Sequence, residues 1–138
     1  MKANEKGMAA VEFGLVLPIL MLLVFGIAEF GIAFYREQVL TGAVREGARK
    51  GVVATSPRPS ETTIKDTVIT YLTNMGWTAS TATVSVVGAQ GASGSPLTVT
   101  ATYPTSFAVL SKLMPMTGIA VDASGNASLS ATVTMELE

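Results

Sequence analysis

The 138 residues predict an α+β fold, in which a long N-terminal transmembrane α-helix precedes a small C-terminal domain with one short helix on an antiparallel sheet. Three patterns carry this prediction. Residues 13–35 are apolar apart from one acid, residues 61–75 repeat apolar side chains at helical spacing, and later segments alternate apolar with hydroxyl side chains. We therefore divide the chain into an N-terminal segment (1–7), a long helix (8–54) and a head domain (55–138).

The membrane span is predicted from the length of the apolar block. Residues 13–35 cover about 34 Å as a helix, which is enough for a hydrocarbon core of about 30 Å. A secretory signal peptide also starts with basic residues such as Lys2 and Lys6, but its apolar core is usually shorter and a cleavage site follows it. The block therefore indicates a spanning helix rather than a cleaved signal.

The same helix is expected to continue beyond the span, because no turn signal follows Tyr35. Apolar and charged residues keep helical spacing up to about residue 53, and two prolines within residues 56–60 end the pattern. Small residues near this end allow close helix packing, or alternatively weaken the helix there. They are Gly42, Ala43, Gly47, Ala48 and Gly51.

The head domain begins with a predicted short helix that Ser60 caps and Gly76 ends. Its apolar face comprises Ile64, Val68, Tyr71, Leu72 and Met75. Alternation predicts strands over residues 82–86, over 97–103 with Pro104 as the end, and over 127–138. These strands form the sheet that the short helix covers.

The remaining segments are predicted as connections. Residues 88–96 read as a flexible linker, since their glycines lack the Lys-Ser/Thr of a phosphate-binding loop. Residues 107–115 suggest an apolar turn, Ile119 and Val121 a short strand, and residues 122–128 a turn.

Composition excludes several classes of function. Nine Lys and Arg against ten Asp and Glu give a net charge of −1, so we expect no nucleic-acid partner. Cysteine and histidine are both absent, which excludes thiol and histidine catalysis, Cys/His zinc sites and disulfides. Glu136 and Glu138 share a polar strand face as solvated charges, and Ser111 lacks an activating histidine. We expect no enzyme activity, no metal and no cofactor.

The extreme N-terminus resembles the prepilin processing site of type IV pilins. A leader with two lysines ends in Gly7 directly before the apolar block, and Glu12 follows five residues later. In that family a membrane peptidase cuts after the glycine, which implies a mature chain that begins at Met8. Glycine suits this position because it has no side chain to obstruct the backbone.

A closer resemblance is to TadE-like proteins, the small pilin-like subunits of tight-adherence (Tad) systems. The motifs that carry it are Val11-Glu12-Phe13, Leu17-Pro18, Glu29-Phe30-Gly31 and Ala43-Val44-Arg45-Glu46-Gly47-Ala48-Arg49. The resemblance implies a type IV pilin-like fold in the bacterial inner membrane, with a cytoplasmic N-terminus and an outer head. It implies as partners a prepilin peptidase, other pilin or pseudopilin subunits, Tad-type assembly machinery and the lipid bilayer.

The resemblance also suggests roles for residues within the span. Glu12 and Phe13 would act in assembly, with Glu12 pairing with the new α-amino group of Met8 on a neighbouring subunit, although an acid can also simply mark a helix start. Pro18 would kink the helix or melt one turn, or have no special role. Glu29 would pair with Arg36 or a neighbour's arginine, or serve as an interfacial acid.

Two functions follow from these observations. The leading hypothesis is a structural subunit that is cleaved after Gly7 and assembled into a homo- or hetero-oligomeric pilus or pseudopilus outside the inner membrane. The alternative is an unprocessed single-pass membrane protein whose outer domain binds a ligand or partner. Sequence alone does not distinguish a major subunit from a minor one.

Overall fold

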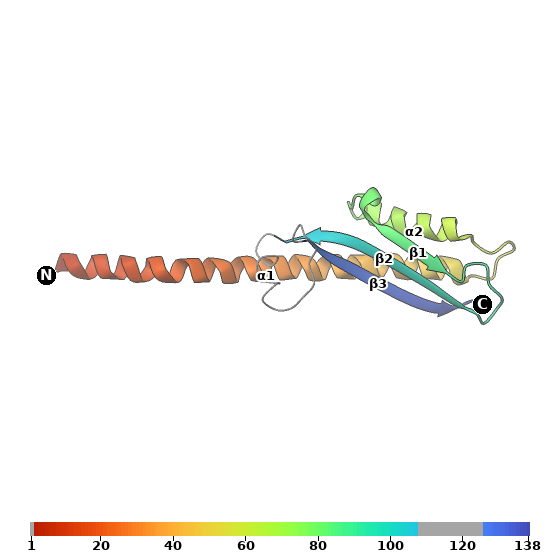
Figure 1. Cartoon of the computed structure of the whole chain (residues 1–138), viewed down its shortest axis with the longest axis horizontal. Coiled ribbons are helices and arrows are strands. Elements are labelled where there is room, and N and C mark those ends of the chain that lie inside the picture. Colours follow the sequence, from red (N-terminus) through yellow and green to blue (C-terminus); the bar gives the residue numbers. More distant parts are fainter. Residues whose placement is uncertain (1, 108–125) are drawn as a thin grey trace.

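The computed structural model describes residues 2–107 and 126–138. Figure 1 shows a long helix whose C-terminal part lies beside a second helix and a sheet, and whose N-terminal part extends away from both. The elements are α1 (Lys2–Val52), α2 (Glu61–Asn74), the 3-10 helix η1 (Ala79–Thr81), β1 (Thr83–Val87), β2 (Pro96–Ser106) and β3 (Asn126–Glu136). The predicted α+β class is confirmed.

Helix α1 is continuous over 51 residues and is about 75 Å long at the standard rise. It begins at Lys2 rather than at residue 8, because residues 2–7 contain good helix formers and no proline. It ends at Val52, close to the predicted end, and the chain then enters the segment with the Ser56–Pro57 cis peptide bond.

Both ends of α2 are where the sequence predicts them. The Ser60 hydroxyl accepts a hydrogen bond from the Thr63 backbone N–H at 3.3 Å, which satisfies a free donor of the first turn. After the helix, Gly76 has a φ of +81°, a left-handed conformation that favours glycine. These interactions involve only nearby residues.

The buried face of α2 differs from the prediction at one residue. Ile64, Val68 and Leu72 are buried as expected. Met75 is 45% exposed, so its predicted place on this face is wrong. It is the C-cap residue, with a ψ of 7°, and its backbone therefore no longer follows the helix.

The sheet has three antiparallel strands in the order β1-β2-β3. At its centre Thr100 pairs with Ser85 on one side and with Thr132 on the other. The inner face carries the buried apolar side chains Val86, Leu97, Val99, Ala101, Ala127 and Ala131. On the outer face, hydroxyls pair across strands, as between Thr98 and Thr134 at 2.9 Å. The predicted alternation is confirmed.

Two predicted strand limits are wrong. β2 continues through Pro104 to Ser106, because β1 pairs no further than Thr102 and proline is tolerated where one side of a strand has no partner. β3 begins at Asn126, inside the predicted turn 122–128, because it pairs there with Ser106. The apolar turn and short strand expected within residues 108–125 lie outside the described residues.

The connection between β1 and β2 is anchored rather than a free linker. Gly94 N–H donates to the Leu137 carbonyl at 2.7 Å, and Leu137 N–H donates to the Ser95 carbonyl at 2.9 Å. The Gln90 side chain donates to the Arg58 carbonyl at 3.1 Å. Its glycines therefore permit a folded loop, which composition alone does not reveal.

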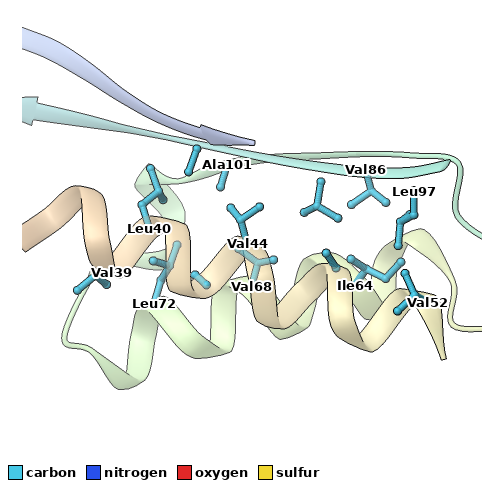
Figure 2. Packing of buried hydrophobic residues seen from close by; sticks show 14 of the residues in the cluster. Val39, Leu40, Val44, Val52, Ile64, Val68, Leu72, Val86, Leu97 and Ala101 are labelled. Atoms are coloured by element: carbon cyan, nitrogen blue, oxygen red, sulfur yellow. The ribbon is translucent and has the colours of Figure 1, made fainter. Parts of the chain in front are cut away.

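The core of the head forms around the C-terminal part of α1 (Figure 2). In this view Leu40 and Val44 of α1 point toward Leu72 and Val68 of α2 and toward the sheet. Burial of one such aliphatic side chain contributes about 1.5–3 kcal/mol. The small head thus depends on residues 39–52 of the long helix for its core.

Candidate functional site

The N-terminal half of α1 exposes a continuous apolar surface. Its exposed large side chains are Met8, Val11, Phe13, Leu15, Val16, Ile19, Leu20, Met21, Leu22, Leu23, Val24, Phe25, Ile27, Phe30, Ile32, Phe34 and Tyr35. Soluble monomers rarely expose a contiguous apolar patch of this size. By length and composition α1 is a candidate membrane-spanning helix, and its most apolar window has no residue buried inside the protein.

The predicted processing and assembly residues lie near the free end of this helix. A Cβ added to Gly7 meets no atom within 4 Å, and Met8, Glu12 and Phe13 are exposed. Glu12 lies one helical turn after Met8, on the same side of the helix. The described part of the head does not cover these residues.

Pro18 lies within the exposed half without interrupting it. α1 remains helical across this residue, which differs from the predicted melted turn. Proline lacks the N–H that would bond to the carbonyl of Gly14, and its ring crowds that carbonyl. A Cβ added to Gly14 meets nothing within 4 Å, so no described residue from another part of the chain packs against this glycine.

Glu29 and Arg36 occupy the last part of the span. Both are half-buried, and Glu29 is engaged in an interaction within the chain. Their separation of two helical turns, about 10 Å along the axis, exceeds the one-turn spacing of helical ion pairs. Arg36 lines a hollow between α1 and the head.

The predicted helix-packing residues contact the head of the same chain. A Cβ added to Gly47 would lie 2.4 Å from Cγ2 of Val68, and one added to Gly42 would lie 2.9 Å from the hydroxyl of Tyr71. Ala43 and Ala48 are fully buried. These small side chains allow α1 to approach α2 closely.

Sequence reasoning missed an aromatic pair next to the end of the span. The ring centroids of Trp77 and Tyr103 are 4.3 Å apart, with an angle of 54° between the planes. Trp77 follows the Gly76 stop, and Tyr103 belongs to β2, so nothing in the local pattern connects them. The one available signal is that Trp77 is the single tryptophan of the chain.

The described residues contain no cluster of three or more Asp and Glu side chains that could hold a metal ion. The ion pairs Arg49–Glu46 and Lys65–Glu61 are exposed, and each lies within one helix. A hydrogen bond from Arg49 to Glu46, together with the attraction of the carboxylate, raises the pKa of Arg49 above its usual value. These groups therefore act as helix-surface charges.

The geometry defines a class of protein, one that has a candidate membrane-spanning helix whose C-terminal half forms part of the core of a small α+β head. Residues 7–49 match the family model described as TadE-like protein. This match confirms the resemblance, and it includes both the exposed half of α1 and most of its buried half. No curated protein and no solved structure matches the chain.

Proposed function

We propose that this protein is a structural subunit, a TadE-like prepilin or pseudopilin, that is cleaved after Gly7 and assembled through its N-terminal helix into a Tad-type pilus or pseudopilus. The observation that carries the proposal is that the family match over residues 7–49 includes the whole exposed apolar part of α1, from Met8 to Tyr35. The family match itself points to a Tad pilus-associated protein.

The exposed apolar surface of α1 would be covered both before and after assembly, by different partners. Before assembly, lipid covers the apolar side chains of residues 13–35 in the inner membrane, with the head outside. In a filament, neighbouring helices cover the same side chains. Because lipid tails and aliphatic side chains are similarly apolar, this exchange requires little change in hydrophobic free energy, and close packing and polar contacts decide association.

Glu12 supplies such a polar contact. Cleavage after Gly7 creates an α-amino group on Met8, and a neighbour's Glu12 carboxylate would pair with it. An ion pair in an apolar environment has a strong attraction and leaves neither charge alone in the hydrocarbon. The pair would therefore set the axial register between subunits, with no catalysis by the subunit itself.

Cleavage is tested by the intact mass of the membrane-bound chain. The wild-type mass should correspond to a chain that starts at Met8, and Gly7→Leu should leave the full-length mass. Gly14→Leu is the matched control, because the fold has open space at both glycines. A full-length mass for the wild type would contradict cleavage and favour the unprocessed membrane anchor.

Assembly is tested with Glu12→Ala. The variant should insert into the membrane but be absent from sheared surface filaments or from complexes with other pilin subunits. Glu37→Ala is the control, since this exposed acid lies on the same helix beyond the apolar span. Normal assembly of the Glu12→Ala protein would refute the proposed pairing.

A further inference from the structure

A hollow of about 440 Å³ lies where α1 meets the head at the end of the apolar span. Among the described residues, its lining combines three aromatic rings and one cation with no acidic side chain. The lining residues are Ile32, Tyr35, Arg36, Met75, Gly76, Trp77, Thr78 and Tyr103. They come from α1, from the turn after α2 and from β2.

The aromatic part of the hollow is held in place by the fold. The Trp77 backbone N–H donates to the Leu72 carbonyl at 3.0 Å, directly after the left-handed Gly76. The Trp77 ring packs on Tyr103 with a centroid distance of 4.3 Å. Tyr35, at the last position of the apolar block, remains 58% exposed beside them.

The position of the hollow along α1 matches the surface of a bilayer. The span from Phe13 to Tyr35 is about 34 Å long, close to the thickness of the hydrocarbon core, so Tyr35 and Arg36 reach the headgroup level when the span is inserted. Tryptophan and tyrosine are enriched at this level in membrane proteins. Figure 1 shows that the C-terminal end of β2 and the start of β3 lie at the end of the sheet nearest the exposed half of α1.

Arg36 provides charge complementarity to a phosphate. Its guanidinium can donate two parallel hydrogen bonds to phosphate oxygens. Arg36 takes part in neither the Arg49–Glu46 nor the Lys65–Glu61 ion pair. Its surroundings, apolar rings with one cation, suit the phosphate of a lipid and the upper part of its acyl chains.

We infer that this hollow binds the phosphodiester headgroup of a membrane phospholipid, so that the head rests on the bilayer surface until the subunit leaves the membrane. The inference rests on the membrane stage of the proposed function. It does not depend on cleavage or on filament assembly. The lipid, rather than a second copy of the chain, is the occupant that the position and the charge favour.

The test uses the uncleaved full chain in vesicles of phosphatidylethanolamine and phosphatidylglycerol. Trp77 is the only tryptophan, so its fluorescence reports on the hollow without labelling. A spin label on the lipid headgroup should quench Trp77 about twofold more than a label at the middle of the acyl chain. Equal quenching by both labels, or none by the headgroup label, would overturn the inference.

Arg36→Gln tests the contribution of charge. Retention of phosphatidylglycerol on the detergent-purified protein, counted by native mass spectrometry, should fall about tenfold. Arg45→Gln is the control, since Arg45 is exposed further along α1 and away from the hollow. Unchanged retention in Arg36→Gln would refute the phosphate contact.

Two further outcomes separate this inference from the proposed function. In the first outcome the chain inserts and is cleaved normally, but Trp77 is shielded from solvent only at high protein density. A second copy then covers the hollow, and the lipid inference fails while the proposed function stands. If the chain does not insert into vesicles at all, the membrane stage fails and the lipid inference fails with it.

Discussion

The two halves of α1 have opposite surroundings although one uninterrupted helix contains both. In the N-terminal half, Leu23 is 54% exposed, and a Cβ added to Gly31 meets nothing within 4 Å. In the C-terminal half, Leu40 is fully buried, and a Cβ added to Gly47 would overlap Val68. Helix formation is therefore common to both halves. The head covers the second half, and the first half is left for the lipid or subunits of the proposed function.

The largest expected difference between the halves comes from removing a leucine side chain. Leu40→Ala should lower the free energy of unfolding of the head by about 2–5 kcal/mol, because it leaves a cavity between α1, α2 and the sheet. Leu23→Ala should change this free energy by no more than about 0.5 kcal/mol. Denaturant unfolding in detergent, followed by Trp77 fluorescence, measures both. Equal losses would contradict the division of α1.

Adding a methyl group should have a somewhat smaller effect. Gly47→Ala should destabilise the head by about 1–3 kcal/mol, since the new Cβ would lie 2.4 Å from Cγ2 of Val68 and α2 must shift. Gly31→Ala should cause no loss, because the space around Gly31 is open. The same unfolding measurement applies. A neutral Gly47→Ala would show that α2 is not in close contact with α1.

Loss of the α2 cap should affect only the half of α1 that α2 covers. Ser60→Ala removes the hydrogen bond to the Thr63 N–H and should lower the free energy of unfolding of the head by about 1 kcal/mol. Membrane insertion, measured by alkaline extraction, should not change. The control is Thr62→Ala at an exposed position of α2. If Ser60→Ala also impaired insertion, the two halves would not be independent.

The smallest expected effect is that of pH. The chain has no histidine, the side chain that ordinarily titrates between about pH 5 and 8. The raised pKa of Arg49 gives a stabilisation that is complete below the usual arginine pKa and is lost only as pH rises through the raised value, far above this range. The unfolding midpoint of the head should therefore stay constant from about pH 6 to 8. A marked slope would reveal a titrating group in the head.

Features that depend only on neighbouring residues could be predicted from the sequence. The hydroxyl of Ser60 bonds three residues along the chain, Gly76 accepts a left-handed backbone, and alternation assigns each side chain of β3 to a face. The span follows from the length of one apolar block, and the motif around Glu12 led to the TadE-like resemblance that the match over residues 7–49 supports. These are local properties of the chain.

Contacts between residues that are distant in the sequence could be seen only in the folded chain. The tertiary structure placed Gly47 against Val68, extended β2 past Pro104 because β1 ends earlier, and turned Met75 away from the core. It also brought Arg36, Trp77 and Tyr103 to one hollow from three separate elements. Periodicity shows whether a side chain lies on the apolar or the polar face of its helix or strand. The identity of its contact partner depends on how the helices and strands pack, and that packing depends on many contacts between distant segments.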